Sequence, residues 1–193
     1  VLFVDNQDSF VHTLASYARQ TGATVITLRS GFPYQMLDEI SPDLLFISPG
    51  PGFPSEQKVP ELVGEALKRD IPIFGVCRGM QVINSYFNGK IETLTNSKHV
   101  DNPHSVKIVN SNFSSLLKAD SIEVNSYHNN IIKQNILGNE LEPFALSFGD
   151  ETIEGFFHRK FPIVGVMWHP ERDPNHNNKI ILSKIFHEKD FWN

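Results

Sequence analysis

The pattern of apolar and polar positions divides the chain into two halves. In the first half, short apolar runs such as VLFVD (1–5) alternate with helix-length amphipathic segments such as DSFVHTLASYARQTG. Unbroken apolar runs are typical of strands buried on both faces, and the amphipathic segments are typical of helices that cover them. A mainly parallel sheet with helices on both faces is therefore expected. The expected strands are 1–5, 24–28, 43–48 and 71–76, and the expected helices are 8–22 with Asp8 as N-cap and Gly22 at the end, 33–40, 58–70 and 78–87.

The second half has a different pattern. Five strand-like segments are separated by short turns rich in Asn, Gly and Lys, with little helix between them. They predict antiparallel additions to the sheet. The segments are KIETL, SVKIV, SIEVNS, PFALSFG and TIEGFFH. An apolar run returns at 162–170 and a helix is expected at 179–189, so residues 1–193 are interpreted as one α/β domain.

Composition narrows the functional classes. The net charge is −5, with no run rich in Lys or Arg, which argues against nucleic acid or an anionic membrane surface as partner. No apolar run approaches the roughly 20 residues of a membrane span. The amino terminus does not resemble a signal peptide, and its lack of methionine fits a processed or excised segment. A single cysteine excludes an internal disulfide, and a reducing cytoplasm is the expected compartment.

That cysteine, Cys77, lies in GVCRGMQ between an apolar run and a helix. In open α/β sheets, reactive groups lie at the carboxyl ends of strands. Gly75 and Gly79 permit a sharp strand-to-helix turn, as in a nucleophile elbow. The helix N-terminus would lower the pKa of the thiol and offer N–H groups to an oxyanion. Cys77 is therefore a candidate nucleophile; the alternative is a small buried core residue.

A thiol nucleophile needs a base and an orienting carboxylate. The run PIVGVMWHPER places His169 and Glu171 after another expected strand. Residues two apart in extended chain point the same way, so Glu171 can contact the imidazole nitrogen that faces away from Cys77. The alternative is a solvated surface turn. Together the three residues form a Cys–His–Glu triad hypothesis.

These residues carry a family resemblance. GVCRGMQ, WHPE and the upstream SPGPGFPSE together resemble the class I (triad) glutamine amidotransferases, with their G-x-C-x-G-x-Q elbow and H-P-E. The resemblance covers essentially the whole chain and implies a flavodoxin-like fold. It implies hydrolysis of the glutamine side-chain amide through a γ-glutamyl thioester, with ammonia delivered to a partner synthase. It gives Cys77 the role of nucleophile, His169 that of general base and acid, and Glu171 that of orienting group.

The same resemblance suggests groups that bind the substrate. It places an oxyanion-hole amide in the loop SPGPGFP (48–54), at Gly50 or Gly52, with the Arg78 amide as its partner. Gln81, one helical turn beyond the cysteine, would contact the amino-acid end of the substrate. The alternatives are a tight structural turn for the loop and a helix-surface glutamine for Gln81. No cofactor is implied. The histidine spacing in HPERDPNHNN matches no usual zinc pattern, so no metal is expected.

Two branches of the superfamily share the motifs. VLFVDNQDSF and FISPGPGFPSE resemble the glutaminase domain of anthranilate synthase, including forms fused to the synthase, although Arg78 and Met80 depart from its elbow. RGMQVIN, VNSYHNNII, TIEGFFH and GVMWHPER look like the γ-glutamyl hydrolases, which cleave other γ-glutamyl amides without a synthase. In that branch Tyr127, His128 and Asn129 would line the pocket. We favour the glutamine-hydrolysing interpretation. A non-enzymatic flavodoxin-like binding module is the third hypothesis.

Overall fold

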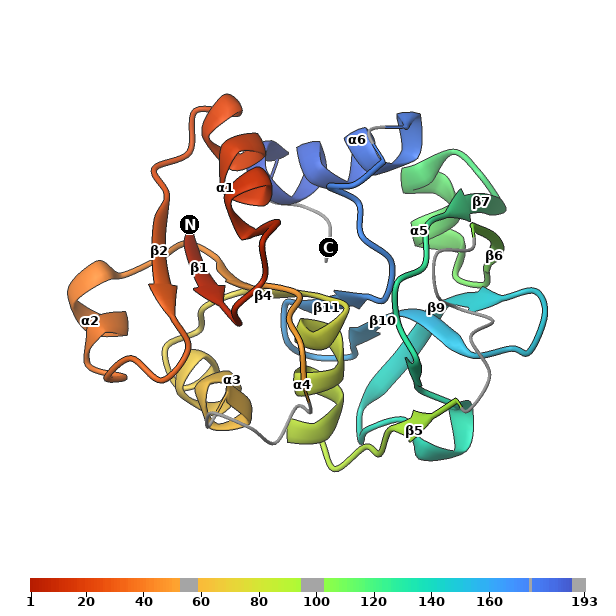
Figure 1. Ribbon diagram of the computed structural model, residues 1–193, viewed down its shortest axis with the longest axis horizontal. Helices are drawn as coiled ribbons and strands as arrows, with labels where there is room; N and C mark the ends of the chain where they lie inside the picture. The colour runs from red at the N-terminus through yellow and green to blue at the C-terminus, as the bar shows by residue number, and fades with distance from the viewer. Residues whose placement is uncertain (53–58, 95–102, 174, 189–193) are drawn as a thin grey trace.

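The computed structural model describes residues 1–52, 59–94, 103–173 and 175–188 (Figure 1). Strands and helices alternate through the first half, as the apolar pattern predicts. The elements there are β1 (Leu2–Asp5), α1 (Val11–Gln20), β2 (Ile26–Arg29), α2 (Met36–Ile40), β3 (Leu45–Ile47), α3 (Val59–Leu67), β4 (Ile73–Val76) and α4 (Arg78–Tyr86). The later elements are β5 (Glu92–Thr93), β6 (His104–Ile108), α5 (Ser111–Leu117), β7 (Ser121–Val124), β8 (Asn130–Ile131), β9 (Leu141–Ser147), β10 (Ile153–His158), β11 (Ile163–Val166) and α6 (His176–Ser183).

Within the described residues, nine strands form one sheet in the order β2-β1-β3-β4-β11-β10-β9-β6-β7. The strands from β2 to β11 pair in parallel, and those from β11 to β7 pair antiparallel. The predicted fold class, a flavodoxin-like parallel sheet with antiparallel additions from the second half, is confirmed. The last long apolar run returns to the centre of the sheet, where β11 lies beside β4.

Alternating strand residues build a core on each face of the sheet. Phe3, Phe46 and Phe74 from neighbouring strands point to one face, with ring centroids 4.6 and 5.5 Å apart along the series. Residues of α1, α5 and α6 cover this face. The aliphatic residues next to them in the chain, such as Leu45 and Ile73, point to the other face, which α2, α3 and α4 cover. Figure 1 shows α1 and α6 on one side of the sheet and α3 and α4 on the other.

Three local expectations were wrong. Helix α5 lies at a position where a turn and no helix was assigned, in a half expected to hold little helix; the Asn110 side chain caps it by accepting hydrogen bonds from two backbone amides. Asp8 does not cap α1, which begins after Phe10; its carboxylate accepts from the Phe10 amide and closes the preceding turn. The strand expected at 24–28 lies at 26–29. Gly22, with φ +87°, follows α1 as expected.

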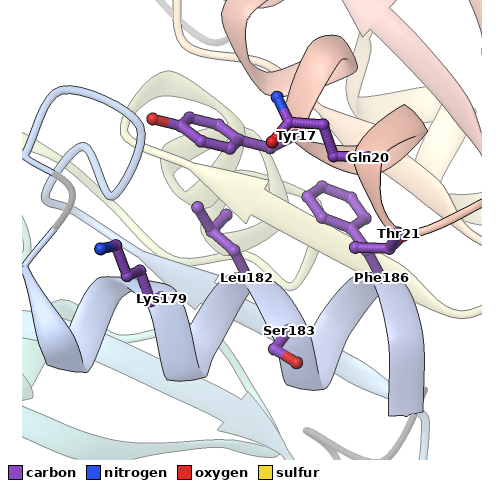
Figure 2. A pocket seen from close by; sticks show the side chains of 7 residues that line it. All are labelled: Tyr17, Gln20, Thr21, Lys179, Leu182, Ser183 and Phe186. Atoms are coloured by element: carbon purple, nitrogen blue, oxygen red, sulfur yellow. The ribbon is translucent and has the colours of Figure 1, made fainter.

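A groove between α1 and α6 lies apart from every predicted site residue (Figure 2). Its wall combines apolar side chains with a few polar ones. The lining residues are Tyr17, Gln20, Thr21, Lys179, Leu182, Ser183 and Phe186. None of the described helices has the length and apolar composition that crossing a membrane requires.

Candidate active site

The cysteine lies at a sharp turn between β4 and α4. Cys77 has φ +51° and ψ −105°, a strained backbone conformation that functional turns often hold. β4 and β11 are paired in parallel, with Val76 opposite Val166, and the Cys77 amide donates to the Val166 carbonyl at 2.8 Å. Because β11 leads directly to His169, this pairing brings two segments that are far apart in sequence to the same edge of the sheet.

Two glycines allow the turn to be so tight. A Cβ at Gly79 would lie 2.2 Å from the carbonyl oxygen of Ile47 on β3, and one at Gly75 would lie 2.6 Å from the carbonyl carbon of Gly79. No real Cβ tolerates such distances from backbone atoms. The first turn of α4 therefore packs directly on the sheet, and its N-terminus lies at the cysteine.

His169 lies between Glu171 and the cysteine. Its Nδ1 is 2.8 Å from Glu171 Oε1, and its side chain interacts with that of Cys77 strongly enough for each to shift the pKa of the other. All three residues are buried. The Asn125 side chain fixes the His169 backbone twice: Nδ2 donates to its carbonyl at 2.7 Å, and Oδ1 accepts from its amide at 2.8 Å.

The electrostatics favour an ion pair between sulfur and imidazole. Burial raises the pKa of Cys77, but the hydrogen bond and charge of His169, the charge of His128 and the Arg78 amide together lower it below its usual value. Burial lowers the pKa of His169, but contacts with Cys77 and Glu171 raise it to about 9. Both shifts favour a thiolate beside an imidazolium, the reactive form of a cysteine nucleophile.

The glycine-proline loop after β3 is held against this turn. Asn6 at the end of β1 donates from its side chain to the Ser48 carbonyl at 2.9 Å. A Cβ at Gly50 would lie 2.3 Å from the Asn6 carbonyl oxygen, so only glycine allows this approach. Gly52 has φ +83°, and the Arg78 side chain donates to the Pro51 carbonyl. Phe53 and Pro54, the rest of the motif, lie outside the described residues.

Comparison with known proteins identifies the family of this chain. The model of the family described as glutamine amidotransferase class-I matches residues 2–189. The chain belongs to the class I glutamine amidotransferase family. It is accordingly a cysteine-dependent glutamine amidotransferase, and the resemblance inferred from the elbow and WHPE is confirmed at the family level.

Individual relatives favour the anthranilate synthase branch. An anthranilate synthase from Azospirillum brasilense is 37% identical over 175 residues, which cover 89% of this chain and 23% of that protein. The aminodeoxychorismate/anthranilate synthase component 2 of Bacillus subtilis is 33% identical, with 89% of this chain and 87% of that protein covered. A solved glutamine amidotransferase from Thermotoga maritima has the same fold, with a TM-score of 0.71 at 18% identity over 97% of this chain and 83% of that one. These relatives do not favour the γ-glutamyl hydrolase alternative.

The residues predicted to contact the substrate differ in how far they are buried. Gln81 is buried on α4, its Nε2 3.6 Å from the sulfur of Met167. Tyr127 is partly exposed, and its ring packs edge-on against that of His169 at 5.6 Å between centroids. His128 is buried, and its charge lowers the pKa of Cys77. Asn129 is exposed, and its carbonyl accepts a hydrogen bond from the Leu94 amide.

Three residues at the site were missed from the sequence. Asn125 fixes the His169 backbone, Glu154 is a fully buried carboxylate next to His128, and Arg172 lies with its guanidinium carbon 4.4 Å from the centre of the Tyr127 ring. All three lie inside segments that carried the family resemblance, but none of them gave a separate signal. Among the described residues, no group of His, Cys, Asp and Glu is arranged to hold a metal ion.

Proposed function

We propose that this amidotransferase hydrolyses the side-chain amide of glutamine through a thioester on Cys77 and supplies the ammonia to a synthase of the anthranilate synthase type. The observation that carries the proposal is the position of Cys77 and His169 after two adjacent parallel strands, with His169 Nδ1 2.8 Å from Glu171 Oε1. The presence of anthranilate synthase proteins among the relatives supports the choice of partner.

Acylation begins with the thiolate of Cys77 attacking the amide carbon. The carbonyl oxygen gains negative charge, and the Arg78 amide with that of Gly50 or Gly52 would stabilise it. The imidazolium of His169 then gives its proton to the amide nitrogen, and ammonia leaves. Glu171 accepts the hydrogen bond from Nδ1 and so directs the other ring nitrogen to the reacting atoms.

Deacylation uses the same groups in reverse. Neutral His169 takes a proton from water, and the resulting hydroxide attacks the thioester carbon. The intermediate then expels the thiolate of Cys77, releases glutamate and leaves His169 protonated again. The sum is glutamine and water converted to glutamate and ammonia.

Gln81, Tyr127, His128 and Asn129 are proposed to line the glutamine pocket. The contacts of Gln81 are long, 3.6 Å to the Met167 sulfur and 3.5 Å to the Asn130 amide, so a substrate amino or carboxylate group can replace them at small cost. Tyr127 is the exposed wall next to the base. This pocket lies at the edge of the sheet where the ammonia would be released to the synthase.

The test measures glutamate release from glutamine, and from γ-glutamyl amides with a substituted nitrogen, with and without a partner synthase subunit. We expect hydrolysis of glutamine that increases when the partner is added. Cys77→Ser should lower the rate of glutamine hydrolysis at least about 10³-fold while the protein still folds. Faster, partner-independent cleavage of the substituted amides would overturn the proposal in favour of a γ-glutamyl hydrolase. A Cys77 that a diazoketone analogue of glutamine fails to alkylate would favour a binding module.

A further inference from the structure

A fully buried carboxylate that the proposed reaction does not use lies on β10. Glu154 Oε1 is 3.6 Å from Nε2 of His104 on β6 and 3.8 Å from Nε2 of His128. A carboxylate without access to water is strongly unfavourable unless cations neutralise it. The backbone of Glu154 also joins the active site, since its carbonyl accepts from the Met167 amide at 2.7 Å, two residues before His169.

Both ring nitrogens of His128 face acceptors. Nδ1 is 3.0 Å from the carbonyl oxygen of Asn130, and Nε2 faces the carboxylate of Glu154. The carbonyl can only accept, so Nδ1 carries a proton, and the carboxylate at ion-pair distance favours a second proton on Nε2, which makes the ring an imidazolium. Burial lowers the pKa of His128, but Glu154, Cys77 and the Asn130 carbonyl raise it above the usual value. Burial raises the pKa of Glu154, but the two histidines lower it to about 2, so it stays ionised.

The residues on either side of His128 hold it against the catalytic groups. Tyr127 packs edge-on against the His169 ring. The Asn130 side chain donates to Gln81 Oε1 at 3.5 Å, one helical turn beyond the nucleophile. The segment therefore contacts both the base and the nucleophile helix, and the imidazole between these contacts acts electrostatically on the cysteine.

We propose that Glu154, together with His104, keeps His128 as a lasting imidazolium that stabilises the Cys77 thiolate whatever the protonation state of His169. The inference rests on the proposed function in taking Cys77 as the nucleophile. Glu154 and His104 are positioning residues that act through His128.

A lasting charge matters because His169 changes its own. After His169 has protonated the departing ammonia it is neutral, and it stays so until it takes a proton from water. When the tetrahedral intermediate then expels sulfur as a thiolate, His169 is protonated again, and His128 would add a second positive charge. A second cation that gives no proton away lowers the free energy of that leaving group. Among the residues that the structure describes, the charged and titratable groups that act on Cys77 are His169, which follows β11, and His128. Glu154 on β10 and His104 on β6 act on His128 in turn.

The test uses the fact that Cys77 is the only cysteine. The rate of its alkylation by iodoacetamide is measured at a series of pH values by intact-mass spectrometry. This rate reports the fraction of Cys77 that is ionised at each pH. With Glu154→Gln we expect alkylation roughly tenfold slower at acidic pH, with rates converging in alkali where the thiol is ionised in both proteins. His128→Gln should act similarly, and His104→Gln less. Glu142→Gln on β9, a partly exposed carboxylate paired with Arg159, removes the same charge and should leave the profile unchanged.

A second measurement needs no variant that might fail to fold. In the unmodified chain labelled with ¹⁵N-histidine, both nitrogens of His128 should keep imidazolium chemical shifts through neutral pH. A neutral His128 ring at pH 7, or a folded Glu154→Gln protein with an unchanged alkylation profile, would overturn the inference. Neither readout involves glutamine, so failure of the proposed function, seen as absent glutamine hydrolysis, is distinguishable from failure of this one.

Discussion

Replacement of Asn125 by Ala should impair stability and catalysis together. The side chain makes two buried hydrogen bonds with the His169 backbone, at 2.7 and 2.8 Å. Its removal leaves a buried amide and a buried carbonyl unsatisfied, at about 1–3 kcal/mol each, or roughly 2–6 kcal/mol in total. For a domain of this size each kcal/mol lowers Tm by about 2–4 °C. A displacement of His169 by ~1 Å would in addition lower kcat by about 10²-fold.

Asn84 provides the matched control. It is also buried and makes the same kind of contacts with backbone groups, donating to the Lys90 carbonyl at 2.9 Å and accepting from the Gly138 amide at 2.8 Å. It lies seven residues beyond the nucleophile, about 10 Å along α4. Asn84→Ala should lose comparable stability by thermal unfolding yet keep kcat for glutamine, measured well below its Tm. Equal losses of kcat in the two variants, or a fully active Asn125→Ala, would refute the positioning argument.

Three further predictions follow from the site. The pKa of Cys77 is lowered and that of His169 is raised to about 9. We therefore expect kcat/KM for glutamine to fall in acid as the thiolate gains a proton, to stay level through neutral pH and to fall above about pH 9 as His169 loses its proton. A value of kcat/KM that still rises above pH 9 would contradict the ion pair. Glu171→Gln should lower kcat by less than the ~10³ expected for the cysteine variant, and should move the alkaline limb to lower pH; an unchanged limb would exclude the orienting role. Gly79→Ala, whose Cβ meets a β3 carbonyl oxygen at 2.2 Å, should cost about 3 kcal/mol or more in urea unfolding, whereas Gly149→Ala, with nothing within 4 Å, should be nearly neutral.

The parallel half of the fold was predictable because each buried strand there is an unbroken apolar run. Ile73–Val76 and Ile163–Val166 are buried along their whole length. A short run of consecutive apolar residues is typical of a parallel strand that is covered on both faces. Helix α5 was missed because its seven residues, SNFSSLL, bury only Phe113 and Leu117. Such a short amphipathic pattern is too weak to distinguish from a turn, and only the Asn110 cap marked its start.

That Cys77 and His169 lie at the same edge of the sheet was predictable for a topological reason. The carboxyl ends of adjacent parallel strands meet at one edge of a sheet, and both Cys77 and His169 follow such ends, directly or within a few residues. Asn125 and Glu154 were not predictable in this way, because they come from antiparallel strands whose order in the sheet the sequence does not encode locally. Glu154 in particular, within TIEGFFH, resembles an outward-facing polar residue of a half-buried strand, yet it is fully buried.

The segments that divided the family resemblance meet in space. NSYHNN supplies His128 and TIEGFFH supplies Glu154, and their side chains lie 3.8 Å apart next to the nucleophile. A buried carboxylate is tolerated only with its cation, and a buried imidazolium only with its anion, so neither residue can change alone without leaving an uncompensated charge beside Cys77. The two segments that resemble the γ-glutamyl hydrolases therefore contribute to a single charge pair in the surroundings of the thiol. Such a pair is compatible with a chain whose relatives include anthranilate synthase proteins. On this argument the double variant Glu154→Gln/His128→Gln should be more stable than the sum of the single losses, because it removes both buried charges together.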